Sequence, residues 1–385
     1  MRINPFAKKI GILGGGQLGK MLYQAATPLD LNVHFLDQSV EFPVGKICPH
    51  FTEGSFKNYE DVMLFGKDKD VISIEIEAVN VDALRDLEKQ GKDVYPQPEV
   101  IALIQDKGQQ KQFFEDCKAP SSAFSIIESL ADLTEKISEG SILFPFVQKL
   151  RRDGYDGRGV QIIRNESDLK KAFDAPSVIE DLVNIKTEIS VIVARQSDEE
   201  FAIYDPVEML IDPSANLLDR QIAPARIPLE LAEEAKNLAS QIAYELQIVG
   251  LLAVEMFIDT NDNLWINELA PRPHNSGHHT IEACQTSQYE QHLRSILGLP
   301  LGDPSMLSPS LLMNVLGELD HTGPAYYDGL SECLSIDGVH VHLYGKAITK
   351  PMRKMGHINI VDSNLESAQL KYEHIKSTLK VISYE

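Results

Sequence analysis

Two apolar segments on either side of residue 260 each carry one acidic residue. The segments are LLAVEMFID, which contains Glu255, and LWINELA, which contains Glu268, and the polar residues 260–263 (TNDN) join them. Asn-Asp favours a two-residue hairpin turn, and counting outward from residues 261–262 places Glu255 directly opposite Glu268 on one face. Cross-strand Cβ atoms lie only ~4.5–5.5 Å apart, where like charges repel. The segment therefore predicts a β-hairpin with two half-buried carboxylates that need a compensating partner.

Three partners would satisfy these carboxylates. The first is Mg²⁺ held jointly by carboxylates and nucleotide phosphates, with Asn267 as a further oxygen donor. The second is an ion pair with Arg272, and the third is a proton shared between the two acids. The composition of the hairpin favours the metal ion, but the ion pair and the shared proton remain open as alternatives.

The first hundred residues alternate strand and helix patterns. KKIGILGGG is typical of a buried strand that ends in a glycine turn, QLGKMLYQAATPL of a helix, and NVHFLDQ and DVISIEIEAV of further strands. This order predicts an open parallel sheet. Gly14, Gly16 and Gly19 form GxGxxG between strand and helix, and Asp37 ends the next strand, as in NAD- or FAD-binding domains. A loop that binds a phosphorylated sugar, or a tight strand-to-helix turn that binds no ligand, fits the motif equally well.

A glycine-rich basic loop follows the strand SILFPFVQKL. Its sequence RRDGYDGRG begins two residues after Lys149, and the strand VQIIR follows it. Backbone N–H groups of such a loop can bind phosphate. The pattern predicts a flexible cationic flap, and a solvated hairpin loop is the alternative.

Two further polar segments lie near the end of the chain. PRPHNSGHH (271–279) follows the hairpin directly and offers donors beside the expected phosphates; its spacing does not match a usual zinc motif. GKAITKPMRKMGH (345–357) is a basic cluster suited to a phosphate or bicarbonate anion, or a solvated turn.

Composition narrows the functional classes. The net charge of −21 disfavours nucleic acid as a partner, and no run of apolar residues is long enough to cross a bilayer. The four cysteines lack CxxC spacing, and the first residues do not have the pattern of a signal peptide. We therefore expect a cytoplasmic protein without a membrane or nucleic-acid partner.

Five strings, distributed over nearly the whole chain, carry a family resemblance: GGGQLGKM, DKGQQKQFF, GYDGRG, INELAPRPHNSGHH and RKMGHINI. Together they resemble the N5-carboxyaminoimidazole ribonucleotide synthetases of the ATP-grasp superfamily. The resemblance implies a mixed α/β and α+β fold in three parts. These are a Rossmann-like preATP-grasp domain (1–106), an ATP-grasp domain (107–300, with a mobile flap subdomain within 107–190) and a small C-terminal domain (310–385).

The resemblance also implies a role for each residue at a matching position. Contacts to the nucleotide are implied for Lys107, Lys149, Gly154, Tyr155, Asp156, Gly157, Arg158, Gly159, Glu180, Asp181, Leu182, Val183, Glu188, Asn267 and Glu268. Contacts to aminoimidazole ribonucleotide are implied for Gly16, Gln17, Leu18, Glu75, Tyr155, Arg158, Asn275, Ser276, Lys346 and Arg353. The metal ligands are Glu255 and Glu268, and the catalytic residues are Asp156, Arg272, His274 and Lys354. Lys107 stands where an Arg is common in the family.

The implied activity is the carboxylation of aminoimidazole ribonucleotide in purine biosynthesis. It uses ATP, bicarbonate and Mg²⁺, or Mn²⁺ in its place, in a homodimer. The alternatives are an ATP-grasp ligase or formyl-transferring enzyme that activates formate or an amino acid, a noncatalytic nucleotide sensor and, resting on GxGxxG and Asp37, an NAD-dependent oxidoreductase.

Overall fold

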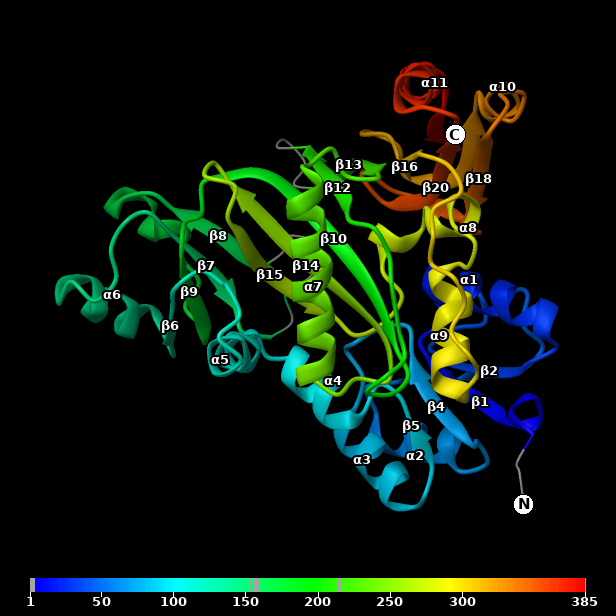
Figure 1. Ribbon diagram of the computed structural model, residues 1–385, viewed down its shortest axis with the longest axis horizontal. Coiled ribbons are helices and arrows are strands. Elements are labelled where there is room, and N and C mark those ends of the chain that lie inside the picture. The colour runs from blue at the N-terminus through cyan, green and yellow to red at the C-terminus, as the bar shows by residue number, and fades with distance from the viewer. Residues whose placement is uncertain (1–3, 153, 155–158, 213–216, 385) are drawn as a thin grey trace.

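A five-stranded parallel sheet forms the N-terminal part of the chain, as the alternating pattern predicts. A computed structural model describes residues 4–152, 154, 159–212 and 217–384. The strand order is β3-β2-β1-β4-β5, and helices cover both faces (Figure 1). The strands are β1 (Lys9–Leu13), β2 (Asn32–Asp37), β3 (Phe51–Glu53), β4 (Val71–Ile74) and β5 (Asp93–Val94). The helices are α1 (Gln17–Ala26), α2 (Tyr59–Gly66), α3 (Val81–Lys89) and α4 (Pro98–Ile104).

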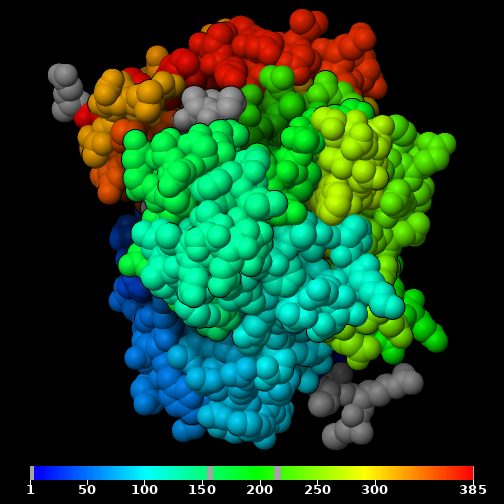
Figure 2. Space-filling model, turned by 90° about the vertical axis from the view of Figure 1, so that its left-hand side faces the viewer, coloured from blue at the N-terminus to red at the C-terminus, as the bar shows by residue number. Residues whose placement is uncertain are grey.

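A small antiparallel sheet follows helix α5 (Lys107–Asp116), with the order β6-β9-β7-β8. It extends from the left of the molecule in Figure 1 and is turned toward the viewer in Figure 2. Ile127, Phe146 and Ile179 pack with Leu133 of α6 to form its own core. The elements are β6 (Phe124–Ile127), α6 (Leu130–Ser138), β7 (Phe146–Leu150), β8 (Val160–Ile163) and β9 (Ser177–Asp181). The predicted flap joins β7 to β8.

The largest sheet has nine strands and runs without interruption into the C-terminal part. Its order is β15-β14-β10-β12-β13-β16-β20-β18, with β11 paired to β10. Strand β16 pairs with β13, so the predicted limit between residues 300 and 310 is not a break in the sheet. The strands are β10 (Ile185–Arg195), β11 (Phe201–Ile203), β12 (Val207–Asp212), β13 (Leu217–Ala223), β14 (Gly250–Asp259), β15 (Leu264–Ala270), β16 (Ser310–Leu316), β18 (Val339–Leu343) and β20 (Lys354–Val361).

Helices pack on this sheet and connect it to its neighbours. Helix α7 (Leu229–Glu245) covers β10 and β14 through an apolar face that includes Leu231, Leu238 and Ile242. Helix α9 (Gln288–Leu297) places Leu293 and Ile296 in the core of the N-terminal part. The remaining α-helices are α8 (Thr280–Ala283), α10 (Leu330–Cys333) and α11 (Leu365–Thr378), and the remaining strands form a three-stranded sheet of β17 (Gly323–Asp328), β19 (Ile348–Thr349) and β21 (Lys380–Ser383). Within the described ranges, no helix is long and apolar enough to cross a membrane.

Candidate active site

The hairpin of β14 and β15 brings Glu255 and Glu268 together, as predicted. The two residues are register partners. The predicted two-residue turn is wrong, because Asp259 pairs with Asn263 around a three-residue turn in which Asp262 has a φ of 63°. The register then shifts by one residue between Glu255 and Met256. This bulge leaves Asn267 as the extra residue and restores the pairing of the two acids.

The same face of the sheet carries a third acidic side chain, that of Glu188. Ser190 of β10 pairs with Glu255, and Glu188 lies two residues before Ser190. Burial, followed by repulsion from Glu268 and then Glu188, raises the pKa of Glu255. Attraction to Lys107 is the main cause that lowers the pKa of Glu268. The two acids therefore have pKa values shifted in opposite directions, and a cation next to Glu255 would favour its ionised form.

Lys107 reaches Glu268 from the first turn of α5, where its ammonium donates a hydrogen bond to Oε2 of Glu268. Asp106 caps this helix by accepting from the N–H of Gly108 at 2.9 Å. The same carboxylate binds Arg151 at the base of the flap, with Oδ2 at 2.8 Å from the guanidinium. Capping fixes the helix N-terminus and so the position of Lys107. Asp106 thus connects the flap to the acidic pair.

Lys149 of β7 lies across from the acidic pair. Its ammonium is 2.9 Å from Oδ1 of Asn267 and 2.9 Å from Oε1 of Glu180. Sequence reasoning missed two further groups at Glu180: Lys111 at 3.0 Å and the hydroxyl of Ser122 at 2.7 Å. Burial would raise the pKa of Glu180, but the two lysines outweigh it and hold the pKa at about 2. Glu180 therefore anchors Lys149 as a negative group between two buried cations.

The predicted nucleotide hinge is the connection between β9 and β10. Asp181 ends β9, Leu182 and Val183 are half-buried, and β10 begins at Ile185. This connection joins the small sheet to the large one, beside Glu188. Its predicted contact with the nucleotide base stays a prediction.

The loop after β15 holds His274 beside Glu255. Nε2 of His274 is 3.4 Å from Oε1 of Glu255, and Nδ1 is 2.9 Å from the hydroxyl of Ser276. Ser276 is 1% exposed and also bonds Ser190 at 2.8 Å. This placement supports a role in orienting His274 rather than direct substrate contact. Burial, with a smaller contribution from Arg272, lowers the pKa of His274 to about 4, so its ring is neutral at neutral pH.

Gln288, at the start of α9, clamps the backbone of His274. Its amide accepts from the N–H of His274 at 2.9 Å and donates to the carbonyl at 2.7 Å. A Cβ on Gly277 would lie 2.4 Å from Gln288, so only glycine fits this close approach. His278 and His279 are buried, and their Nδ1 atoms bond the hydroxyl of Tyr289 and the amide of Gln221. Among the described residues no group of three or more His, Cys, Asp or Glu is arranged to hold a metal ion by itself.

Arg272 is held by Glu77 of the N-terminal part. Its guanidinium donates through Nε and NH2 to the two carboxylate oxygens of Glu77, the second at 3.0 Å, and through NH1 to the carbonyl of Pro273 at 3.0 Å. Burial would raise the pKa of Glu77, but Arg272 holds it at about 2. The predicted alternative, an ion pair of Arg272 with Glu255 or Glu268, is not found among the described residues; the ion pair of Arg272 in these residues is with Glu77.

Two carboxylates bind the backbone N–H groups of the N-terminal glycine loop. Oδ2 of Asp37 accepts from Gly15 at 2.7 Å, and the carboxylate of Glu75 accepts from Gly16 at 2.9 Å and Gly19 at 2.8 Å. These acceptors occupy the positions where a dinucleotide's phosphate and ribose would bind, so the oxidoreductase alternative loses its support. The side chain of Leu18 is buried in the core.

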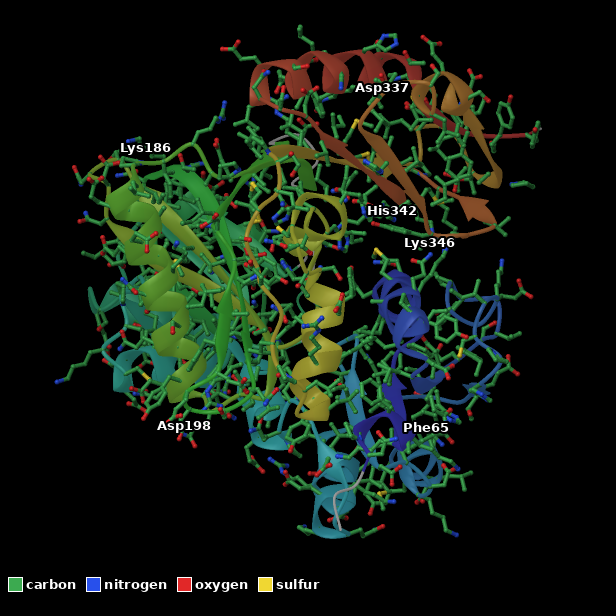
Figure 3. All side chains as sticks on the ribbon, turned by 45° about the vertical axis from the view of Figure 1, so that its right-hand side comes forward. Phe65, Lys186, Asp198, Asp337, His342 and Lys346 are labelled. Carbon is green, nitrogen blue, oxygen red and sulfur yellow. The ribbon has the colours of Figure 1, made fainter. Side chains whose placement is uncertain are left out.

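The C-terminal basic segment lies against α1. Nζ of Lys346 donates to the carbonyl of Lys354 at 2.7 Å, and Lys20 donates to the carbonyl of Leu343 at 2.7 Å. Figure 3 shows Lys346 where the C-terminal strands approach the N-terminal part. Arg353 bonds the carbonyl of Ile348 at 2.6 Å. Asn275 is half-buried in the loop after β15, and Gln17 is half-buried at the start of α1.

The flap is described only in part. Gly154 and Gly159 frame it, and Gly159 has a φ of 81°, which favours glycine. Tyr155, Asp156, Gly157 and Arg158 lie outside the described residues. Their predicted contacts to nucleotide and substrate stay predictions.

Comparison with known protein families matches three successive parts of the chain. Residues 7–105 match the ribonucleotide synthetase preATP-grasp domain, 112–289 the ATP-grasp domain, and 310–371 the phosphoribosylaminoimidazole carboxylase C-terminal domain. These matches agree with the predicted order of the fold.

Curated relatives fall into two length classes. N5-carboxyaminoimidazole ribonucleotide synthase of Bacillus subtilis is 34% identical, over 91% of this chain and 91% of that protein. The chloroplastic phosphoribosylaminoimidazole carboxylase of Vigna aconitifolia is 39% identical over 94% of this chain but only 65% of its own length. The chain likewise spans about two thirds of the carboxylase of Candida albicans, 66% of its length.

Solved structures extend the similarity to the whole fold. N5-carboxyaminoimidazole ribonucleotide synthetase from Thermotoga maritima superimposes with a TM-score of 0.90 at 39% identity, covering 98% of this chain and 100% of that one. The Aspergillus clavatus synthase in complex with ADP and 5-aminoimidazole ribonucleotide gives 0.88 at 30% identity, covering 97% and 99%.

Proposed function

Because the chain belongs to the N5-carboxyaminoimidazole ribonucleotide synthase family of ATP-grasp enzymes, we propose that it carboxylates 5-aminoimidazole ribonucleotide with ATP and bicarbonate. The observation that carries the proposal is the pairing of Glu255 with Glu268 on one face, with Lys107 and Lys149 directed at the same place. This arrangement is suited to a nucleotide's phosphates and a divalent cation.

The donor set fits Mg²⁺, with Mn²⁺ as a substitute. Glu255 and Glu268 would hold the ion, and Asn267 offers an amide oxygen beside them. Burial and the neighbouring carboxylates raise the pKa of Glu255. A bound hard cation would offset this repulsion and favour the ionised carboxylate. Further ligands would come from the phosphates. When bound, the ion neutralises charge on the transferred phosphoryl group.

The chemistry we propose has two steps. A bicarbonate oxygen attacks the γ-phosphorus, ADP leaves and carboxyphosphate forms. The exocyclic amine of aminoimidazole ribonucleotide then attacks the carboxyl carbon and expels phosphate, or it attacks CO2 after carboxyphosphate has broken down to CO2 and phosphate. In both routes the nitrogen loses a proton. His274 is neutral at neutral pH and lies beside Glu255, so it is one acceptor for that proton, and Asp156 of the flap is another.

The remaining residues would bind and orient the substrates. Lys346 and Arg353 would supply positive charge for the ribonucleotide phosphate. Lys20 of α1, the helix that follows the glycine loop, contacts Leu343 just before this basic segment. Arg272 and Lys354 would hold the bicarbonate-derived group. Closure of the flap would exclude water from carboxyphosphate, which hydrolyses readily. We further propose a homodimer in the cytoplasm, and sedimentation of the purified chain tests the first of these.

ADP release from the purified chain tests the proposed activity. We expect release with MgATP to require both aminoimidazole ribonucleotide and bicarbonate at full rate, and EDTA to abolish it. Replacing bicarbonate with formate in CO2-depleted buffer is the control. Faster release with formate would favour a formate-activating ligase, and ATP binding without turnover would favour a nucleotide sensor.

A further inference from the structure

One tripeptide of the N-terminal part, Glu75-Ile76-Glu77, contacts two sides of the candidate active site. Glu75 binds the N–H groups of the glycine loop, and Glu77 takes the guanidinium of Arg272 through both carboxylate oxygens. Gln105 holds the backbone at and just after Glu77, because its amide donates to the carbonyls of Glu77 at 2.7 Å and Val79 at 2.9 Å. The substrate-side loop and the reacting centre are therefore connected through three residues of chain.

The contact between Glu77 and Arg272 fixes an orientation as well as a charge. A guanidinium is planar, and two donors on one edge bound to one carboxylate fix both its plane and its rotation. The carbonyl of Pro273 accepts from a third nitrogen of Arg272. Displacements of about 1 Å at a reacting centre cost roughly 10²-fold in rate, so a group that fixes Arg272 acts on the reaction itself.

The ion pair is not needed to attach the N-terminal part to the rest of the chain. Leu293 and Ile296 of α9 already lie in that part's core, and the hydroxyl of Ser73 bonds His292 of α9 at 2.8 Å in a buried position. If the ion pair of Glu77 and Arg272 served only to hold the two parts of the chain together, it would add little to this packing.

On the basis of the proposed function, we infer that Glu77 is a positioning residue for the carboxylation reaction. It sets the orientation of Arg272 toward the bicarbonate-derived group and keeps that group in register with the ribonucleotide bound near Glu75. Glu77 itself need not touch a substrate.

The variant Glu77→Gln keeps the shape and removes the charge. In steady-state ADP release with the full chain, we expect kcat/KM for bicarbonate to fall about 30- to 100-fold, while KM for MgATP changes less than about 3-fold. Glu77→Asp keeps the charge on a shorter side chain and is expected to recover part of the loss.

Glu208→Gln is the matched control. Glu208 also makes a two-pronged ion pair with one arginine, Arg226, at 2.8 and 2.7 Å, but it pairs with Ile189 of the α7-facing core. We expect its kinetic constants to stay near those of the wild type. Thermal melting of each variant confirms that the comparison is made on folded protein.

The effect of Glu77→Gln is measured a second time in the Arg272→Lys variant. Lysine cannot form the two-pronged contact, so in this variant Glu77 has no guanidinium to orient. There, adding Glu77→Gln is expected to change kcat/KM less than about 3-fold. A wild-type bicarbonate dependence in Glu77→Gln, equal losses in Glu77→Gln and Glu208→Gln, or a full additional loss in the Arg272→Lys background would each overturn the inference. Failure of the proposed function is recognised separately, since the wild type would then show no bicarbonate-dependent ADP release.

Discussion

Replacing Glu268 with glutamine is expected to lower kcat for ribonucleotide- and bicarbonate-dependent ADP release by about 10³-fold or more. The change removes one of the two charges that would hold the magnesium ion and leaves Lys107 without its carboxylate partner. Steady-state ADP release across a range of magnesium concentrations measures the effect. We expect excess magnesium to recover only part of the rate.

Glu255→Gln and the double variant complete this test. Two ligands that act on one ion are strongly non-additive, so the double variant is expected to be little slower than either single one. Glu208→Gln, on the other face of the same sheet, is the control for the charge change. Near-normal turnover of Glu268→Gln would remove the metal role and the foundation of the proposed mechanism.

Replacing Glu180 with glutamine is expected to destabilise the fold by about 3 kcal/mol, because removing one partner of a buried ion pair leaves the other charge uncompensated. Lys111 and Lys149 both contact this carboxylate, and all three side chains are at least largely buried. Urea unfolding at pH 7 and thermal melting measure the loss. Nucleotide binding is expected to weaken as well, because Lys149 loses an anchor beside Asn267.

The pH dependence of stability provides a second measurement at Glu180. Its folded pKa of about 2 lies below the ~4.3 of an unfolded glutamate. The stabilisation is therefore fully present above the unfolded value and is lost as pH falls toward 2. The difference between wild type and Glu180→Gln should shrink in that range.

Glu99→Gln is the matched control for this ion pair. Glu99 pairs with Arg85 on the surface, where the side chains are 73% and 35% exposed, and such pairs contribute about 0–1 kcal/mol. An equal loss of stability in both variants would contradict the assignment of Glu180 as a buried anchor.

Local pattern was sufficient to predict the acidic pair but not its turn. Alternating apolar residues placed both acids on one face. The turn was wrong because Asp259 accepts hydrogen bonds from the backbone of Asn261 and Asn263 and so closes a longer loop around Asp262. The longer turn shifts the strand register by one residue, and the bulge at Asn267 shifts it back, so Glu255 still pairs with Glu268.

Contacts between distant segments could not be predicted in this way. Glu77 and Arg272 are 195 residues apart, and neither periodicity nor composition relates them. The nucleotide contact expected of Glu180 stays a prediction, and its ion pair with Lys111 was not expected, because the sequence did not single out Lys111. Asp37 ends a strand as a ribose-binding acid would. The sequence does not show that its carboxylate accepts a hydrogen bond from the N–H of Gly15.

The uninterrupted nine-stranded sheet limits where this polypeptide can be cut. Trimming it after residue 309 would strip β16 from β13, expose the hydrogen-bonding groups of residues 220–223 and uncover Ile222. Bare strand edges of this kind recruit other chains. The last fifth of the chain is therefore expected to be an inseparable part of the fold, and a protein shortened in this way should accumulate as inclusion bodies instead of active enzyme.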